Sequence, residues 1–423
     1  MKVRPGESGQ ELRIIAFAYA CEPDKGSEPG AGWVWSQMLT SLGQVWIVTR
    51  ANNRSAIEAA MPSIESRDRL HFAYVDLPRW ARFWKRGQRG LRLYYLLWQL
   101  AALRSARRLH RSENFDLAWH LTLANAWLGS TAALIGPPFV YGPVGGGVGT
   151  PWRLLPTLGG RGIGYELLRA WMRFWGRYLN PLARLAWMRA RLILAQNPDL
   201  ERWLPERHRS KVHVLPNAVF DGSPLLNAEE REPSKVAVFA GRLLPWKGVA
   251  IAIHAIAELP DWRLVVCGRG RDEQRLRRLA ERLGVVERVE FRGWVARERL
   301  QEIMQTEVDV FLFPTMHDEA GWVVVEAMAS GVPVLCLDVG GPPVLIGQSG
   351  YAVPVQGGQA IVVRRIAKAL DTAVVPAARH AALERSIAFL RSSVEKRLRD
   401  LVESELRDSL ASEPGRKRLN NAA

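Results

Sequence analysis

Short apolar runs alternate along the chain with longer segments in which apolar residues recur at helical spacing. Leu12–Ala18 is typical of a buried strand, a glycine-rich loop CEPDKGSEPGAG follows, and residues 33–42 have helical periodicity. Strand, loop and helix in this order predict the start of a βα unit. We expect further strands in the first half at 45–49, 70–75, 117–121, 139–142, 192–196 and 212–215. Helical segments separate several of them, which predicts a parallel sheet covered by helices.

A second series of the same kind fills the other half of the chain. Strands are expected at 235–240, 263–267, 289–292, 308–313 and 333–337, and helices at 249–259, 272–283, 298–305 and 323–330. Gly284 and Gly331 follow two of these helices, where a C-terminal capping glycine is expected. The polar, acidic segment LLNAEEREPS separates the two series and is typical of a linker.

The expected organisation is therefore α/β, with two Rossmann-like domains. A chain of 423 residues is long for one hydrophobic core, and its hydrophobic fraction of 48 % is that of a globular protein. We predict an N-terminal domain at 1–224, the linker at 225–234, a second domain at 235–385, and at 386–423 a C-terminal helix packing back on the first domain, with a polar tail. Ligands of such sheets bind at the carboxyl ends of the strands, and a cleft lies between two such domains.

Charge and cysteine content narrow the function classes. Lys and Arg number 58 against 42 Asp and Glu, a formal excess of +16 that suits an anionic partner or, more simply, reflects a basic solvated surface. The three cysteines form no CxxC pair, so a disulfide framework or zinc site is not expected, which fits a cytoplasmic location. The N-terminus MKVRPGESGQELR is too polar for a signal peptide, and we expect no transmembrane helix.

The segment MHDEAGWVVVEAMASG carries the first candidate site. The chain is expected to leave a strand, pass Asp318 and Glu319, and turn into a helix at Gly321. The N–H groups of Gly321, Trp322 and Val323 would then be unpaired at a helix N-terminus, which suits a diphosphate. A carboxylate such as Asp318 or Glu326 can accept hydrogen bonds from vicinal sugar hydroxyls. The simpler interpretation is an acidic N-terminal cap with a surface glutamate.

The segment GRLLPWKG directly follows the first strand of the second domain. Arg242 and Lys247 are five positions apart in a loop bounded by Gly241 and Gly248. Two cations held there could neutralise a leaving diphosphate. Two solvated surface cations are the alternative in so basic a chain.

Together these motifs resemble a known family. Arg-x4-Lys after one strand, Gly268 and Gly270 after the next, and a carboxylate-x7-Glu block before AMASGVPV resemble retaining glycosyltransferase family 4, the glycosyl transferases group 1. In the first half the resemblance extends to the loop 26–32, the histidine of DLAWHLT, the YGPVGGG loop and VLPNAV. It implies the GT-B fold, two Rossmann-like domains facing a central cleft.

The resemblance also implies roles for individual residues. Arg242 and Lys247 match the pair that binds the donor diphosphate, and Glu326 matches the glutamate that contacts the ribose. The residue eight positions before Glu326 is Asp318, where the family has a glutamate that contacts the donor sugar, and Glu319 follows it. Spacing favours Asp318 as the sugar ligand. His120 matches a histidine near the sugar's reacting end, although a lone strand histidine is more often a hydrogen-bonded core residue.

Glycine-rich loops complete the candidate site. Gly30 and Gly32 would let backbone approach phosphate or sugar closely, and so would the Gly-x-Gly pair 268 and 270. Gly145, Gly146 and Gly147 could form a backbone nest for the acceptor or a phosphate, or simply a flexible turn. No cluster has metal-ligand spacing, so we expect no metal and no cofactor besides a UDP- or GDP-linked nucleotide-sugar co-substrate.

Two basic stretches interleaved with aromatic residues suggest a membrane partner. Residues 79–111 contain ten Arg or Lys and no acid, and residues 161–191 contain seven Arg and one acid, Glu166. Both lie in the acceptor-side domain, and arginine with tryptophan suits an anionic bilayer. We hypothesise peripheral attachment at the inner face of the plasma membrane, presenting a lipid-linked acceptor. Core tryptophans covered by arginine stems are the simpler interpretation, and nucleic acid is not an expected partner.

The sequence therefore predicts a retaining glycosyltransferase of the EC 2.4 class, acting from a nucleotide-sugar donor on a glycan or lipid-linked acceptor. Two alternatives stay open. One is a nucleotide-sugar epimerase of the same fold, and the other is a catalytically silent scaffold at a membrane surface.

Overall fold

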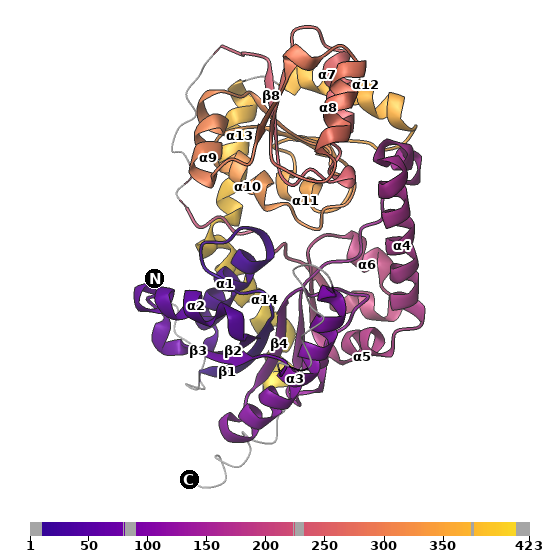
Figure 1. The fold of residues 1–423 in the computed structure, drawn as a ribbon. Helices are drawn as coiled ribbons and strands as arrows, with labels where there is room; N and C mark the ends of the chain where they lie inside the picture. Colours follow the sequence, from indigo (N-terminus) through magenta and orange to yellow (C-terminus); the bar gives the residue numbers. More distant parts are fainter. Residues whose placement is uncertain are drawn as a thin grey trace.

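Two parallel sheets, each with helices on both faces, form the two lobes of the molecule (Figure 1). The computed structural model describes residues 11–78, 80, 90–222, 224, 232–373 and 376–411. The first sheet has seven strands in the order β3-β2-β1-β4-β5-β6-β7. Its strands are β1 (Leu12–Ala18), β2 (Gly43–Arg50), β3 (Leu70–Val75), β4 (Leu117–Thr122), β5 (Phe139–Val144), β6 (Ala190–Ala195) and β7 (Val212–Val214).

Two hydrophobic clusters cover the opposite faces of this sheet. Alternating side chains of one strand separate them, so that Ile14 and Ala16 of β1 face one cluster and Ile15 and Phe17 the other. The helices of this half are α1 (Ser27–Met38), α2 (Arg54–Ala60), α3 (Leu91–Glu113), α4 (Gly159–Tyr178), α5 (Pro181–Arg189) and α6 (Asp199–Trp203).

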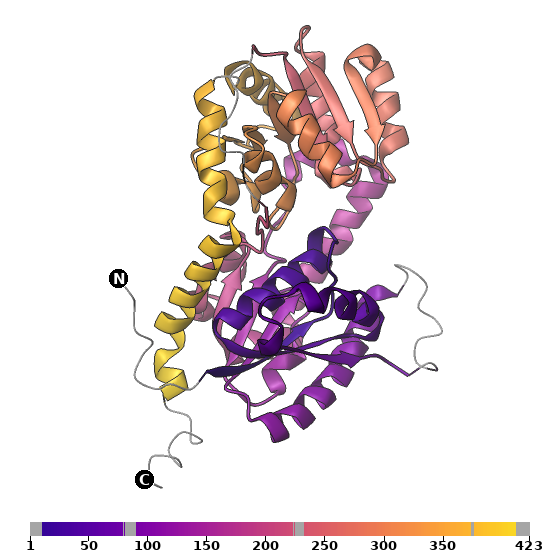
Figure 2. The same cartoon turned by 90° about the vertical axis from the view of Figure 1, so that its left-hand side faces the viewer.

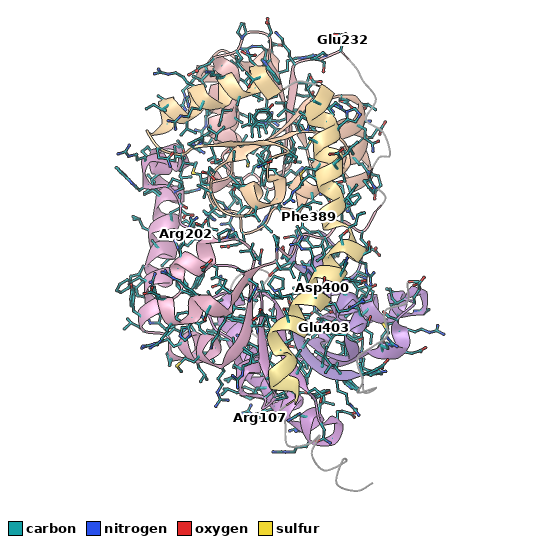
Figure 3. The ribbon with its side chains drawn as sticks, turned by 180° about the vertical axis from the view of Figure 1, so that it is seen from behind. Arg107, Arg202, Glu232, Phe389, Asp400 and Glu403 are labelled. Carbon is teal, nitrogen blue, oxygen red and sulfur yellow. The ribbon has the colours of Figure 1, made fainter. Side chains whose placement is uncertain are left out.

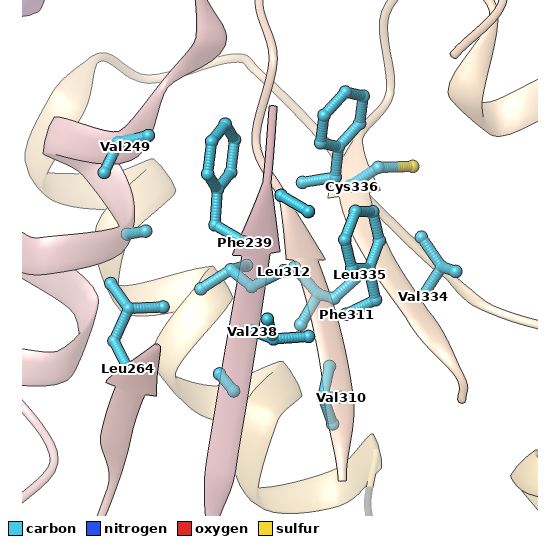
Figure 4. Close-up of a cluster of buried hydrophobic side chains, with 14 of the residues drawn as sticks. Val238, Phe239, Val249, Leu264, Val310, Phe311, Leu312, Val334, Leu335 and Cys336 are labelled. Atoms are coloured by element: carbon cyan, nitrogen blue, oxygen red, sulfur yellow. The ribbon is translucent and has the colours of Figure 1, made fainter. Parts of the chain in front are cut away.

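The second sheet has six strands in the order β10-β9-β8-β11-β12-β13. Its strands are β8 (Val236–Ala240), β9 (Arg263–Cys267), β10 (Val289–Gly293), β11 (Val310–Phe313), β12 (Val334–Leu337) and β13 (Tyr351–Val353). The central strands β8, β11 and β12 are continuous apolar runs because helices bury both faces of the sheet, whereas the edge strand β10 contains Glu290 and Arg292. Figure 4 shows Val238, Phe311 and Leu335 from three adjacent strands in this core. The covering helices are α7 (Val249–Ala257), α8 (Glu273–Arg282), α9 (Arg297–Thr306), α10 (Trp322–Ala329), α11 (Pro342–Ile346), α12 (Gln359–Ala373) and α13 (Pro376–Ser386).

Most expected elements lie where the pattern places them. The strands at 70–75 and 263–267 have the expected bounds, while the helix expected at 33–42 already begins at Ser27. Gly284 and Gly331 end their helices with φ of +65° and +70°. The short strand β13 was not expected, because a three-residue run gives too little periodicity to distinguish it from a loop.

The last helix, α14 (Arg391–Ala411), returns to the first sheet. Figures 2 and 3 show it running from the second lobe down the first, with Phe389 near its start and Asp400 and Glu403 further along. Val394, Leu398, Val402 and Leu406 are buried in the same cluster as Ile14 of β1. Most of the expected linker and the polar tail after residue 411 lie outside the described residues.

Candidate active site between the two sheets

Loops that leave β8 and β11 bring two predicted site residues together. Lys247 lies in the 3-10 turn Pro245–Lys247, and its Nζ pairs with a carboxylate oxygen of Asp318, which follows β11. Both side chains are largely buried, at 15 % and 21 % exposure. The Lys247 Nζ also lies 5.2 Å from the centre of the Phe313 ring. A cation and a carboxylate 71 positions apart in sequence therefore form an ion pair at the carboxyl edge of the second sheet.

The glycine that follows Lys247 explains why the loop fits there. Gly248 has φ of +77°, and a Cβ on it would lie 1.8 Å from the carbonyl oxygen of Pro314. The two loops can therefore approach only because residue 248 lacks a side chain.

Arg242 belongs to the same loop but is exposed. Among the described residues no carboxylate lies within ion-pair distance of its guanidinium. It stands as an available cation beside the Lys247–Asp318 pair.

Gly268 and Gly270 serve a different contact from the one expected. A Cβ at Gly268 would lie 1.8 Å from the carbonyl oxygen of Gly241, and one at Gly270 would lie 2.1 Å from that of Leu243. Their missing side chains let the Arg242 loop pack against the end of β9. In the structure they support the cation loop by close packing.

The helix N-terminus predicted at Gly321 is present. Gly321 has φ of +96° and precedes α10, whose first residues are Trp322 and Val323. In the described part of the chain, the backbone N–H groups of these three residues have no hydrogen-bond acceptor. Such a terminus, next to Lys247, forms a suitable position for a diphosphate.

Glu326 lies one turn into α10. Its side chain is 24 % exposed, and its Oε1 lies 3.0 Å from the Nε of Arg297 on α9. Burial raises the pKa of Glu326, while Arg297 opposes that shift. Because Arg297 is 58 % exposed, it can move aside when a hydroxyl ligand arrives.

Glu319 reaches across to the first sheet. Its Oε1 accepts a hydrogen bond of 2.7 Å from the backbone N–H of Gly146, and its Oε2 accepts one of 3.1 Å from Asn197 Nδ2. Desolvation between the two halves raises the pKa of Glu319, against these hydrogen bonds and the nearby Arg169. Asp318 and Glu319 thus face different partners, the cation loop and the first sheet.

The loop of Gly145, Gly146 and Gly147 is fitted closely to its neighbours. A Cβ at Gly145 would lie 2.8 Å from Cγ of Glu319, and one at Gly147 would lie 2.4 Å from Cα of Leu200. Gly146 has φ of +100°. One N–H group of this loop already holds a carboxylate, and a contact of the loop with the acceptor or a phosphate stays a prediction.

A second acidic residue near Glu319 was not anticipated. Glu28, in the first turn of α1, accepts a hydrogen bond of 2.8 Å from the backbone N–H of Leu123. Burial, together with the charge of Glu319, raises the pKa of Glu28. The positive φ of Leu123 (+53°) marks an unusual turn after β4, but the sequence there, HLTLAN, has no glycine and gave no sign of it.

His120, the predicted residue near the reacting sugar, is enclosed by hydrogen-bond partners. Its side chain is 0 % exposed at the end of β4. Its Nε2 lies 2.9 Å from the Tyr95 hydroxyl and 3.0 Å from the Thr122 carbonyl oxygen, and its Nδ1 bonds the Ser130 hydroxyl. Burial lowers the pKa of His120 to about 4. These contacts agree with the core-histidine interpretation, and the catalytic assignment of His120 stays a prediction.

Gly30 and Gly32, predicted in a loop near phosphate or sugar, lie in a helix instead of a loop. Both lie within α1, and a Cβ on either would lie 1.9 Å from a carbonyl oxygen, that of Lys25 or Ala20. Their small size lets α1 pack on the preceding loop. This packing fixes the helix that carries Glu28, and the ligand contact of the two glycines stays a prediction.

A buried polar contact between the halves was also missed. His317 Nε2 lies 2.6 Å from Glu166 Oε1 of α4, and the His317 ring stacks on Trp246 at 5.1 Å between ring centres. Burial alone would raise the pKa of Glu166, but the contacts from His317, Thr150 and Arg169 outweigh it and lower that pKa. This contact connects α4 to the loops that follow β8 and β11.

A pocket of about 540 Å³ opens between the two halves next to these contacts. It is bordered by Trp152, Arg153 and Asp199 from the first half and by Asp338 and Gln356 from the second. Within the described residues, no three His, Cys, Asp or Glu side chains are grouped so as to hold a metal ion.

Comparison with known proteins identifies the family. The family model for glycosyl transferases group 1 matches residues 227–384. The 2-deoxystreptamine N-acetyl-D-glucosaminyltransferase of Streptomyces fradiae is 30 % identical over 67 % of this chain and 68 % of its own. The D-inositol 3-phosphate glycosyltransferase of Mycobacterium marinum is 37 % identical, but the match spans only 29 % of this chain and 28 % of that protein.

Solved structures show the same architecture. Sucrose-phosphate synthase from Thermosynechococcus elongatus superposes with a TM-score of 0.63 at 17 % identity, covering 95 % of this chain and 100 % of that one. Anabaena HepE in complex with UDP gives a TM-score of 0.59 at 17 % identity, with 93 % and 100 % covered. The chain has the GT-B fold and belongs to the glycosyl transferases group 1 family.

Proposed function

We propose that this protein transfers a sugar from a UDP- or GDP-linked donor to a hydroxyl group of a glycan or lipid-linked acceptor, with retention of anomeric configuration. The observation that carries the proposal is the Lys247–Asp318 pair beside the N-terminus of α10. Cation, carboxylate and unpaired backbone N–H groups are the three partners that a sugar diphosphate needs.

The chemistry required of the protein is mainly charge stabilisation. The bond between the sugar's anomeric carbon and the diphosphate breaks, a bond to the acceptor oxygen forms, and the acceptor proton leaves with the diphosphate. Arg242, Lys247 and the α10 N-terminus would hold the charge that develops on the diphosphate. These groups supply the role that a divalent metal plays in other sites, so we propose that no metal is required.

Competition for Lys247 gives Asp318 its role in this proposal. Without a donor, the Lys247 ammonium is held by Asp318. A bound diphosphate would attract that ammonium more strongly, since it carries more charge, and Asp318 would be released to accept hydrogen bonds from the donor sugar. Glu319 would remain on Gly146 and keep the two halves closed.

Glu326 completes the donor site. Its carboxylate would accept the ribose hydroxyls in place of Arg297. We further propose that the protein works in the cytoplasm at the inner face of the plasma membrane, where a lipid-linked acceptor would enter from the first half.

A transfer assay tests the proposal. Purified full-length protein is given UDP-, GDP- or ADP-linked radiolabelled sugars with a bacterial glycolipid extract, and label in the lipid fraction is measured. We expect transfer from one donor class, abolished by Lys247→Ala and retained in Lys235→Ala, a surface lysine paired with Asp261. If the donor is instead epimerised with no acceptor present, as seen by proton NMR, the proposal is wrong and the epimerase alternative holds.

A further inference from the structure

The outer face of α4 carries a stripe of exposed apolar side chains. Leu167, Trp171, Phe174 and Tyr178 recur at spacings of four, three and four residues, so they lie on one side of the helix. Their exposures are 61 %, 61 %, 57 % and 52 %. Leu168 and Leu179 extend the stripe and are also exposed. In Figure 1, α4 stands at the edge of the molecule along both lobes.

The inner face of the same helix is polar and bonds to the Gly147 loop and to the second half. Arg169 donates to the carbonyl oxygen of Val148, and Arg173 donates to that of Gly147 at 2.5 Å. Glu166 bonds His317 of the second half. The helix is therefore oriented with its charges toward the domain interface and its large apolar side chains toward solvent, the reverse of an ordinary surface helix.

A pocket rich in arginine lies at the end of the stripe. It has a volume of about 680 Å³ and is bordered by Arg177, Tyr178, Arg184, Glu206 and Arg207, with Pro205. In the part of the chain that the structure describes, no carboxylate lies within ion-pair distance of Arg177 or Arg184. Three cations around one acid make the pocket suited to a phosphate group.

We propose that the stripe on α4 inserts into the surface of an anionic phospholipid bilayer and that the arginine pocket holds a headgroup phosphate. Exposed aromatic and leucine side chains flanked by arginine match the apolar and charged layers of such a surface. The role of this surface in presenting a lipid-linked acceptor rests on the proposed function, but bilayer binding itself does not. Loop contacts from Arg169 and Arg173 would couple the bilayer face to the Gly147 loop.

Charge argues against a second copy of the chain as the occupant. Each copy carries a formal excess of +16, and pairing two α4 faces would bring the arginines near each stripe together. An anionic bilayer instead gains from the same cations.

The described part of the first basic aromatic stretch holds both surface and core aromatic residues, and Trp80 is 78 % exposed. Tyr94, Tyr95 and Trp98 of α3 are buried in the hydrophobic cluster on one face of the first sheet. The interpretation as core aromatic residues is therefore right for them. Phe83 and Trp84 lie outside the described residues. No helix in the described ranges is both long and apolar enough to cross a bilayer.

Vesicle co-sedimentation of the full chain, without nucleotide, tests the proposal. The probes are phosphatidylcholine vesicles with and without phosphatidylglycerol, at low and high salt. We expect binding only to the anionic vesicles, and at least roughly tenfold weaker binding for Trp171→Ala/Phe174→Ala. Arg177→Gln/Arg184→Gln should weaken binding by roughly tenfold or more and flatten its salt dependence.

Matched controls distinguish a role of the α4 surface from the effect of removing any exposed tryptophan or arginine. Trp294→Ala removes a tryptophan that is 71 % exposed on the other half, and Arg278→Gln removes an exposed arginine of α8. Both should bind vesicles as wild type does. Since the α4 residues are exposed, their variants should keep the wild-type melting temperature and donor affinity, so loss of vesicle binding would not reflect a lost donor site.

The proposal is overturned if wild-type protein ignores anionic vesicles or if the α4 variants bind them unchanged. It is also overturned if Trp171→Ala/Phe174→Ala converts a dimer to a monomer by light scattering with vesicle binding intact, since the stripe would then be an interface between copies.

Discussion

The carboxylate of Glu319 accepts a 2.7 Å hydrogen bond from the backbone N–H of Gly146, and this contact joins the donor-side loop to the first half of the molecule. Asn197 donates to the same carboxylate. Because the donor is a backbone N–H group, this hydrogen bond depends on the conformation of the Gly146 loop and on the Glu319 side chain. In our proposal, closing of the two halves over the donor therefore requires the hydrogen bond between Gly146 and Glu319.

Gly145→Ala tests this requirement. The new Cβ would lie 2.8 Å from Cγ of Glu319, while the φ of Gly145 is not in the left-handed region, so the loop itself should tolerate alanine. We expect kcat/KM to fall by about tenfold or more, because closure positions the reacting groups, with the melting temperature little changed. Steady-state kinetics and thermal unfolding measure the two effects.

A double-mutant cycle provides the control. Glu319→Ala alone should also lower kcat/KM, but Gly145→Ala should cost much less in that background because its nearest neighbour is gone. Additive losses would show that the glycine acts elsewhere and that the contact does not govern closure.

Asp318 and Glu319 should differ in what they recognise. Asp318→Asn removes the charge opposite Lys247, and we expect kcat/KM for the sugar donor to fall by roughly 10- to 100-fold. Affinity for the nucleoside diphosphate without a sugar should change far less. Asp318→Glu, which adds one methylene, should change the ranking among donor sugars. If instead Glu319→Gln alone altered sugar preference, Glu319 would be the sugar ligand.

Chelation should leave donor binding intact. The positive charge that faces the diphosphate in our proposal comes from Arg242, Lys247 and the α10 N-terminus. Binding measured by calorimetry after treatment with EDTA should match that in buffer containing Mg²⁺. A large loss of affinity on chelation would contradict the proposal.

His120 should make stability depend on pH. Burial lowers its pKa to about 4 in the folded state, from an ordinary value of 6.5. Between these values the unfolded chain binds a proton that the folded chain does not, so stability is full above pH 6.5 and falls as pH decreases toward 4. The contribution is about 3 kcal/mol across the window. Urea unfolding of His120→Gln should therefore show a shallower pH dependence than wild type, whatever its absolute stability; equal slopes would contradict the assignment.

The sequence predicts the fold and the helix N-terminus at Gly321 well, because their signals are local. Buried parallel strands are short apolar runs, and Gly321 before an apolar helix marks an N-terminus directly. The spacing of Lys247 within its loop likewise placed it on the carboxyl edge of the sheet, where it meets Asp318.

Contacts between the halves could not be predicted in this way. Glu166 and His317 lie in unrelated segments, and only the packing of one half on the other brings them together. Glu28 is placed within the first half, by its contact with the backbone of Leu123, 95 positions along the chain. The surroundings of His120 could not be predicted either. Its ring bonds the hydroxyls of Tyr95 and Ser130, which are 25 and 10 positions away in the chain.

The most direct test of the donor site is a thermal-shift measurement with UDP-, GDP- and ADP-sugars on wild type, Lys247→Ala and Glu326→Ala. A ligand that binds only the folded state raises its stability by about 2.7 kcal/mol at a concentration 100 times Kd. We predict that one nucleotide class raises the melting temperature of the wild-type protein and that both substitutions abolish the rise. An equal rise in all three proteins would contradict the assignment of the donor to this site.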